Sequence, residues 1–281
     1  MSEKSGAKAV CWLCPHRCHL ADGQTGFCRA RQNKGGIIRS LNYGLLTSAA
    51  LDPIEKKPLY HFHPGSHILS LGSFGCNLRC PFCQNAPIAC AGERDVPWRE
   101  IAPAELVDAA ASLVTEGNIG LAFTYNEPLV GYEFVYDTAR LLKEVGLATV
   151  LVTNGQIEKD SWLHLLPYID AVNIDLKGFT QAFYDWIGGD LETTKAAIAM
   201  AAEEGVHVEV TTLVIPGKND SAAEMAAEAE WLAGISAELP LHLSRYFPRY
   251  QSKIPMTPVE TLQSLKHVAE ARLRFVHLGN I

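Results

Sequence analysis

The chain has 281 residues and a mass of 30.7 kDa, of which 48% are hydrophobic and 20% charged, enough for one barrel-sized domain with a substantial core. Glycine and proline are near average usage, which excludes disordered, collagen-like and coiled-coil chains. The formal charge of −7 argues against nucleic-acid binding, because neutralising phosphates requires surplus lysine and arginine.

Eight cysteines are distributed unevenly along the chain: four between Cys11 and Cys28, three between Cys76 and Cys83, and Cys90 alone. The first ten residues contain no apolar signal core, and no stretch approaches the ~18–20 apolar residues of a membrane span. We therefore expect a cytoplasmic protein without a membrane partner. In a reducing compartment, clustered cysteines are more often metal ligands or redox groups than disulfides.

Residues 1–65 predict a cysteine-rich, metal-binding cap. Cys11, Cys14 and Cys18 follow a CxxCxxxC spacing, and Cys28 comes next. Four thiolates would complete a zinc site or an iron–sulfur cluster equally well. The sequence leaves both metals open for this second site.

Residues 66–250 alternate short β-branched runs with amphipathic stretches, the pattern of repeated βα units. The expected strands are 68–73, 119–124, 149–153, 171–175, 206–214 and 241–244, and the expected helices are 103–116, 131–145, 159–166, 191–204 and 222–232. Right-handed crossovers between them favour a parallel sheet, either doubly wound or barrel-like. Residues 251–281, with a helix near 259–271 and a strand-like run at 275–278, predict a closing segment.

A cysteine loop directly follows the first predicted strand, with Cys76, Cys80 and Cys83 spaced CxxxCxxC. A four-iron cubane is usually held by four cysteines, so three local ligands leave one iron open to another molecule. Chemistry in barrels and open parallel sheets is found beyond the carboxyl ends of the strands, where this loop begins. A zinc loop or buried unreactive thiols are the alternatives.

This loop resembles the radical S-adenosylmethionine (SAM) superfamily. The resemblance implies a partial (β/α)6 TIM-like barrel and a [4Fe–4S] cluster whose open iron chelates the amino and carboxylate groups of SAM. It also implies that the reduced cluster cleaves SAM to methionine and a 5′-deoxyadenosyl radical, which abstracts hydrogen from a substrate. The aromatic residue before the third cysteine, Phe82, is then expected near the adenine.

The segment TYNEP after the second strand occupies the position of the superfamily's Gly-Gly-Glu-type motif, with Tyr125 and Asn126 in place of the glycines. The resemblance implies that Glu127 receives the SAM ammonium, because a carboxylate accepts charge-assisted hydrogen bonds from a cation. A plain turn and helix start is the alternative for this segment.

The segments VTNG and DLK after the third and fourth strands resemble the activating enzymes of glycyl-radical enzymes. The resemblance implies that Asn154, Asp175 and Lys177 line the SAM site and that the lysine meets the SAM carboxylate. A solvated ion pair is the alternative for Asp175 and Lys177. Val152 replaces the aspartate of those activating enzymes, so we do not expect their cation site.

Three further residues are expected to bind the cofactor. Asn85 matches the Cys-x-Asn extension of the activating enzymes, Thr212, with Thr211 as the other choice, belongs to the fifth strand, and His242, with Arg245 as the other choice, lies near the end of the sixth. A β-forming threonine and a structural histidine are the alternatives for the last two. Cys90 is expected to be a small buried hydrophobe. No acid–base catalyst is expected, because such an enzyme chiefly orients its cofactor and excludes competing reactions.

The segments DPIEKKPLYHF, SLGSFGC, TYNEP, EVTTLVIPGKNDS and LHLSRYFP together resemble the radical SAM enzyme of the AMMECR/Memo gene-neighbourhood group, which is pyruvate formate-lyase-activating-enzyme-like. That resemblance implies an electron donor such as flavodoxin or ferredoxin. Three functions stay open: an activase acting on a glycyl-radical partner enzyme, a radical enzyme acting on a small molecule or peptide, and a non-catalytic iron–sulfur or zinc scaffold.

Overall fold

The computed structural model describes residues 7–281. The first six residues of the predicted cap lie outside the described residues, and so does most of the ten-residue stretch in which no signal core was found. Its centre is an eight-stranded sheet with strand order β14-β13-β12-β11-β10-β9-β7-β6. The strands are β6 (Ser48–Pro53), β7 (His67–Gly72), β9 (Asn118–Phe123), β10 (Ala148–Thr153), β11 (Ala171–Asp175), β12 (His207–Val214), β13 (Leu241–Arg245) and β14 (Val276–Gly279). All neighbouring pairs are parallel except β6 with β7.

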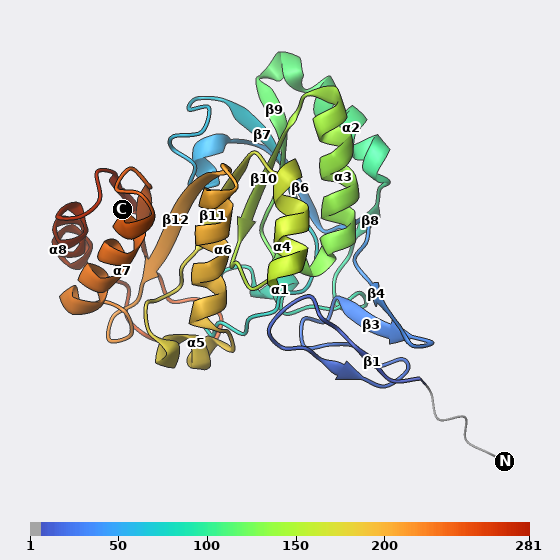
Figure 1. Cartoon of the computed structure of the whole chain (residues 1–281), viewed down its shortest axis with the longest axis horizontal. Helices are drawn as coiled ribbons and strands as arrows, with labels where there is room; N and C mark the ends of the chain where they lie inside the picture. Colours follow the sequence, from blue (N-terminus) through green and yellow to red (C-terminus); the bar gives the residue numbers. More distant parts are fainter. Residues whose placement is uncertain (1–6) are drawn as a thin grey trace.

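The helices are α1 (Ala86–Ala89), α2 (Pro103–Ser112), α3 (Tyr132–Val145), α4 (Lys159–Leu165), α5 (Gln181–Ile187), α6 (Leu191–Glu203), α7 (Ala222–Ile235) and α8 (Val259–Glu270). All except α1 and α5 form an outer layer on this sheet, and Figure 1 shows α3, α4 and α6 in front of β10 and β11. Single 3₁₀ turns are η1 (Ile54–Lys56), η2 (Val114–Glu116), η3 (Pro128–Gly131) and η4 (Leu166–Tyr168). The predicted α/β architecture, a partial TIM-like barrel with parallel strands, is confirmed.

Helix α5 was not predicted, because three of its seven residues are aromatic, and aromatic residues are weaker helix formers than alanine or leucine. Its ends nevertheless carry ordinary start and stop signals. The Thr180 side chain accepts a hydrogen bond from the Phe183 N–H, and Gly188 takes a left-handed conformation at the carboxyl end.

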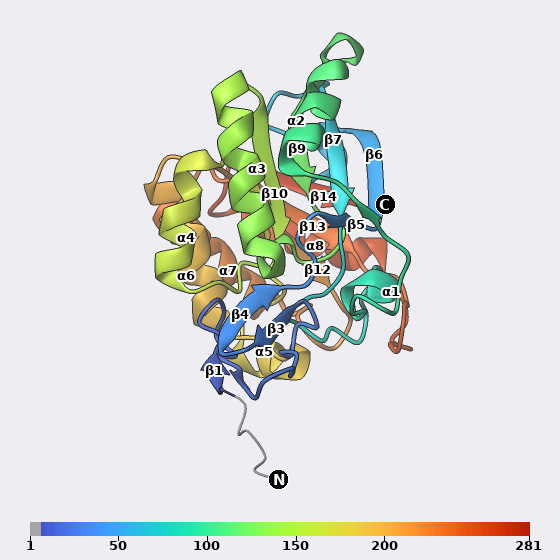
Figure 2. The ribbon, with the colours of Figure 1, turned by 90° about the vertical axis from the view of Figure 1, so that its right-hand side faces the viewer.

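The cap and the closing segment both contribute to the main sheet. β6 belongs to the predicted cap and pairs along its whole length with β7, while β14 belongs to the closing segment and pairs with β13. The rest of the cap forms small two-stranded sheets, β1 (Ala9–Val10) with β2 (His19–Leu20) and β3 (Arg31–Lys34) with β4 (Ile37–Ser40). A third pair joins β5 (Leu45–Leu46) to β8 (Arg99–Glu100). Figure 2 shows β1, β3 and β4 gathered at the end of the molecule that also holds α1 and α5.

The two faces of the sheet differ in chemistry. Leu121, Leu151 and Val172 belong to the main apolar core together with residues of the outer helices. Toward the carboxyl ends of the strands, the opposite, inner face carries the buried polar residues Asn173 and Thr211. Side chains alternate between the faces of a strand, so the sheet buries its core on one side and presents polar groups on the other.

The segment between β6 and β7, residues 54–66, closes the amino-terminal end of the inner face. Ile54 and Leu59 are fully buried and pack with Ile68, Ala122 and Val150 of the strands. We call this segment the connector. Among residues 7–281, no helix combines the length and the apolar character that crossing a membrane requires.

Glu228 of α7 is buried behind the sheet, where its carboxyl group is hydrogen-bonded to the Thr212 hydroxyl. Burial raises the pKa of Glu228 to about 8. A carboxyl group with a raised folded-state pKa contributes stability that is complete below its unfolded pKa, near 4.5, and is lost as the pH rises through about 8. We therefore expect Glu228→Gln to be more stable than the wild type at pH 9, by on the order of 3–5 kcal/mol, and the difference to shrink toward pH 5. Urea unfolding at both pH values measures it, and equal gaps at the two pH values would contradict the prediction.

Candidate active site

A cavity of about 910 Å³ lies along the inner face of the sheet. The cysteine loop after β7 and the carboxyl ends of β9, β10, β11, β12 and β13 form its walls, and Lys57 and Tyr60 of the connector contribute to its lining. Of the predicted site residues in the barrel, all except Thr212 line this cavity: Cys76, Cys80, Phe82, Cys83, Asn85, Glu127, Asn154, Asp175, Lys177 and His242.

Cys76, Cys80 and Cys83 face this cavity together, and no fourth cysteine among the described residues lines it. Burial raises the pKa of the Cys80 thiol to about 12 and that of Cys76 well above its usual value, so metal binding would have to displace their protons. Within residues 7–281 no three His, Cys, Asp or Glu side chains lie close enough to hold a single metal ion. Three thiols without a fourth are the donor set of a [4Fe–4S] cluster with one open iron, so the residues present fit that group.

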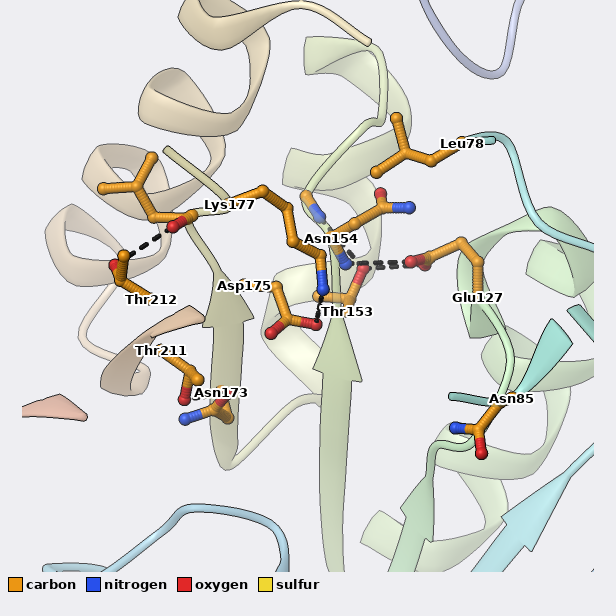
Figure 3. Close-up of polar contacts among 12 residues, drawn as sticks. Leu78, Asn85, Glu127, Thr153, Asn154, Asn173, Asp175, Lys177, Thr211 and Thr212 are labelled. Atoms are coloured by element: carbon orange, nitrogen blue, oxygen red, sulfur yellow. Dashed lines mark hydrogen bonds and ion pairs between the residues drawn. The ribbon is translucent and has the colours of Figure 1, made fainter. Parts of the chain in front are cut away.

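Glu127 is anchored at the end of β9 by three donors. Its carboxylate accepts hydrogen bonds from the Thr153 hydroxyl at 2.7 Å, the Asn154 N–H at 2.8 Å and the Leu129 N–H at 3.0 Å. Figure 3 shows the carboxylate turned toward Thr153 and Asn154 of the neighbouring strand end. The residue is 3% exposed, and burial raises its pKa to about 7. An incoming cation would favour the ionised form, because a charge partner offsets the cost of desolvation.

Asp175 and Lys177 form an ion pair at the end of β11. The Lys177 Nζ lies 2.8 Å from an Asp175 carboxylate oxygen, and Figure 3 shows the lysine reaching back toward the strand. Burial disfavours the charged lysine, but the charges of Asp175 and of the nearby Cys80 outweigh it and raise the Lys177 pKa. Lys177 is therefore a permanent cation, and it lines the same cavity as the cysteine loop.

Asn154 links the cysteine loop to Glu127. Its backbone N–H donates to Glu127, and its side-chain amide donates to the Asn77 side chain at 2.9 Å and to the Cys76 sulfur at 3.7 Å. On the other side of the loop, the Asn85 amide donates to the backbone oxygen of Tyr125 at 2.6 Å. These contacts hold the loop against the ends of β9 and β10.

Phe82 is 5% exposed and belongs to an aromatic cluster beside the cavity. Its ring centroid lies 5.4 Å from that of Trp186 and 6.4 Å from that of Tyr246. Phe82 therefore supplies an apolar surface in the cavity wall next to Cys83.

Thr212 is not brought to the cavity. Its hydroxyl points behind the sheet, where it donates to Leu176 O and contacts the Glu228 carboxyl group, whereas Thr211 lines the cavity and donates to the Asn173 side chain. Figure 3 shows the two threonines turned in opposite directions. Neighbouring strand residues face opposite sides, so a choice between them requires knowing which face is inner.

His242 combines structural contacts with a place in the cavity wall, and Cys90 is less buried than predicted. The His242 Nε2 lies 2.6 Å from the buried Glu209 carboxylate, and its ring packs edge-on against Tyr60 of the connector. These contacts position the ring, and its contact with the cofactor stays a prediction. Cys90 is half-buried and outside the cavity lining, not the buried residue that was expected.

A polar cluster around Asp52, which was not predicted from the sequence, lies at the cavity floor. Asp52 accepts hydrogen bonds from Lys57 at 2.9 Å and from the Tyr125 hydroxyl at 2.8 Å, and Lys57 lies over the Tyr125 ring. Burial opposes ionisation of Asp52, but the bonds from Lys57, Tyr125 and Lys56 lower its pKa overall. Tyr125 also has a positive φ of 68°. The polar residues of the connector were visible in the sequence, but their meeting with Tyr125 was not.

Replacing Thr212 by valine tests the assignment of the two threonines. We expect Thr212→Val to lower the free energy of unfolding by ~1–3 kcal/mol, because it leaves Leu176 O without its donor and the Glu228 carboxyl group without its hydrogen-bond partner, and to leave SAM affinity unchanged. Thr211→Val, which alters the cavity wall, is the matched comparison for ligand binding. Chemical unfolding and equilibrium SAM binding measure the two effects, and a loss of SAM affinity in Thr212→Val alone would contradict the assignment.

Comparison with known proteins places this arrangement in a family. Residues 71–229 match the family model of the radical SAM superfamily, which spans the cysteine loop, Glu127 and the Asp175–Lys177 pair. The chain belongs to the radical SAM superfamily. This family of enzymes uses a [4Fe–4S] cluster and SAM, and the residues of the cavity fit both.

Relatives of this radical SAM enzyme extend the match. An uncharacterized protein of Methanocaldococcus jannaschii is 39% identical over 277 residues, which cover 98% of this chain and 82% of that protein. The pyruvate formate-lyase-activating enzyme of Clostridium pasteurianum is 28% identical over 149 residues, 52% of this chain and 61% of that enzyme. The match therefore spans about three fifths of the activating enzyme.

Solved structures show the same fold. A domain of a pyruvate-formate lyase-activating enzyme from Bacteroides vulgatus superposes with a TM-score of 0.51 at 20% identity, covering 57% of this chain and 99% of that domain. Streptococcus suis SuiB bound to S-adenosylmethionine superposes with a TM-score of 0.58 at 14% identity, covering 75% and 51%. At these identities the likeness concerns the fold alone.

Proposed function

We propose that this radical SAM enzyme cleaves SAM reductively and uses the resulting radical to abstract hydrogen from a substrate held in the same cavity. The observation that carries the proposal is that one cavity is lined by Cys76, Cys80 and Cys83, by Glu127 and by the Asp175–Lys177 pair. When bound, the cluster supplies one electron to the SAM sulfonium, which gives methionine and a 5′-deoxyadenosyl radical.

The side chains have separate tasks in this proposal. The three cysteines hold the cluster, and the anchored Glu127 accepts the SAM ammonium. Lys177 pairs with the SAM carboxylate, and Asp175 fixes the direction of the lysine. Phe82 provides a flat apolar surface for the adenine. Asn154 acts as a positioning residue, because it holds Glu127 and Cys76 in one arrangement.

The cavity has room for more than the cofactor. Ligand cavities run from roughly 300 to 1,000 Å³, so 910 Å³ accommodates SAM and part of a substrate. The similarity to pyruvate formate-lyase-activating enzymes supports a glycyl-radical partner enzyme as that substrate, with a glycine-bearing loop entering the cavity. An electron donor of the flavodoxin or ferredoxin class is the second protein partner that the proposal needs.

A polar small molecule or peptide is a second candidate substrate. The floor of the cavity is closed by the connector and is lined by the polar side chains of Lys57, Tyr60 and Tyr125. Such convergent polar groups are typical of sites that orient a small ligand.

Anaerobic reconstitution with iron and sulfide, followed by SAM and a strong one-electron reductant, tests the shared part of the proposal. We expect 5′-deoxyadenosine and methionine in equal amounts. Protein that carries a cluster by iron analysis and yet forms neither product would overturn the proposal.

Isotope transfer separates the two substrates. Deuterium from a labelled glycine of a co-incubated partner enzyme should enter 5′-deoxyadenosine, together with a glycyl-radical EPR signal in that partner. Deuterium entering from a labelled small molecule or peptide, without a glycyl signal, would favour the second candidate.

A further inference from the structure

The four cap cysteines converge on a second cavity. Cys11, Cys14, Cys18 and Cys28 all line it, and so does Arg31. The β1–β2 ladder brings the first and third cysteines together, because the Cys11 N–H donates to Cys18 O at 3.0 Å. Cys28 comes from the segment before β3, so the chain returns to the same place to supply the fourth thiol. The convergence is therefore built by pairing of the cap strands.

Arg31 presents an unsatisfied donor beside these thiols. Its side chain is 8% exposed, and its two Nη atoms donate to the Glu133 carboxylate at 2.7 and 2.6 Å. Its Nε, in contrast, has no hydrogen-bond partner within the described part of the chain. A buried N–H without an acceptor costs free energy. Arg31 and the four cap cysteines line the same cavity, so an anionic sulfur there would offer the missing acceptor.

The second cavity is joined directly to the cysteine loop of the first. The Cys76 N–H donates to Cys28 O at 3.3 Å, and the His16 ring nitrogen lies 2.8 Å from Asn77 O. Gly75 makes this approach possible. It has a φ of 90°, and a Cβ there would lie 2.6 Å from Cys28 O and 2.9 Å from the Ala30 Cβ. Cys28 and Cys76, one predicted ligand from each cysteine group, are thus joined by a single backbone hydrogen bond.

We propose that Cys11, Cys14, Cys18 and Cys28 hold a second [4Fe–4S] cluster that passes single electrons to the cluster at Cys76, Cys80 and Cys83. This electron transfer, which we call the relay, rests on the proposed function, whereas the presence of the second cluster does not depend on it. Zinc is redox-inert, so a zinc ion in the cap could not pass an electron across the contact between the two cysteine groups. Hydrogen bonds to sulfur tune the potential of an iron–sulfur cluster, and Arg31 Nε is placed to make one.

The electrons balance through the relay. A one-electron reductant of the flavodoxin or ferredoxin class reduces the cap cluster by one electron and is itself oxidised by one. The cap cluster returns to its oxidised state as it reduces the second cluster. That electron then enters the SAM sulfonium as its carbon–sulfur bond breaks, so one donor electron is consumed for each SAM cleaved.

Metal analysis of the full chain tests the second cluster without reference to activity. After anaerobic reconstitution we expect about eight iron atoms and eight sulfides per chain. The paired variants Cys14→Ala/Cys18→Ala and Cys80→Ala/Cys83→Ala should each retain about four, and Cys90→Ala should retain all. Zinc at about one per chain with only about four iron atoms in the wild type would overturn the proposal.

EPR and donor dependence test the relay. The dithionite-reduced wild type should show a spin-coupled spectrum that differs from the sum of the spectra of the two paired variants. In Cys14→Ala/Cys18→Ala, SAM cleavage driven by a flavodoxin-type protein should be lost relative to cleavage driven by dithionite. An unchanged ratio, or a spectrum equal to the sum, would overturn the relay. Protein with two coupled clusters that cleaves no SAM with either reductant would instead overturn the proposed function and leave the second cluster standing.

Discussion

Replacing Cys80 by alanine should abolish SAM cleavage. Cys80 is one of three thiols in the main cavity, and no other described cysteine lines that cavity to take its place. With two thiolates left, two irons of a cubane would lack a cysteine ligand, whereas only the iron that binds SAM should lack one. We expect 5′-deoxyadenosine to fall to the background of protein without iron.

Cys90→Ala is the matched control for this experiment. Cys90 lies seven residues after Cys83 but outside the cavity lining, so its removal should leave cluster content and SAM cleavage unchanged. Iron content, EPR and product analysis should be run on both variants. If Cys80→Ala kept its activity while Cys90→Ala lost it, the assignment of the cluster ligands would be wrong.

Glu127→Gln should weaken SAM binding by roughly 30- to 1,000-fold, which corresponds to about 2–4 kcal/mol for removing one partner of a buried charge pair. A glutamine cannot supply the negative charge that the SAM ammonium needs. Its amide group would also bring a donor toward the Thr153 hydroxyl or the Asn154 N–H, which already donate to Glu127. Equilibrium binding of SAM to cluster-loaded protein measures the change.

The pH dependence of binding identifies the cause of this loss. Because the Glu127 pKa is raised to about 7, the carboxyl group is ionised above that pH and protonated below it. Wild-type affinity for SAM should therefore fall as the pH drops through about 7, and the glutamine variant should lack this transition.

Stability measurements guard against misfolding as the explanation. A carboxyl group whose folded-state pKa is raised contributes stability at low pH that is lost as the pH rises through that pKa. The stability of ligand-free Glu127→Gln relative to the wild type should therefore increase between pH 5 and pH 8. Glu228→Gln, which alters another buried carboxyl group with a raised pKa, should leave SAM affinity unchanged. Equal losses of affinity in the two variants would show that the charge at Glu127 is not what binds SAM.

The parallel strands, the outer helices and the cysteine loop followed from local patterns in the sequence, whereas the antiparallel strand β6 was not predicted. Glu127, Asn154 and Asp175 could be assigned to one edge of the sheet from their positions after predicted strands, because the carboxyl ends of parallel strands lie at the same edge. Helix α5 escaped prediction because three of its seven residues are aromatic, and aromatic residues are weaker helix formers.

The face of each side chain was decided only by the tertiary structure. Thr211 and Thr212 are equivalent in the sequence, and the sheet alone determines which hydroxyl reaches the cavity and which meets Glu228. The connector reads as a polar loop, yet its chain path brings Lys57 beside Asp52 and Tyr125 on the cavity floor. Such contacts join residues far apart in the chain, so no local pattern encodes them.

The cysteines show the same division. The sequence by itself determined that there are two clustered groups and that the group at Cys76, Cys80 and Cys83 lies at a strand end, because spacing and strand periodicity are local properties. Only the tertiary structure decided that Cys28 hydrogen-bonds to Cys76 and that Arg31, with a buried Nε that has no partner among the described residues, lines the cavity of the cap thiols. Close packing of the cap against the barrel creates both features, and packing depends on the whole chain at once.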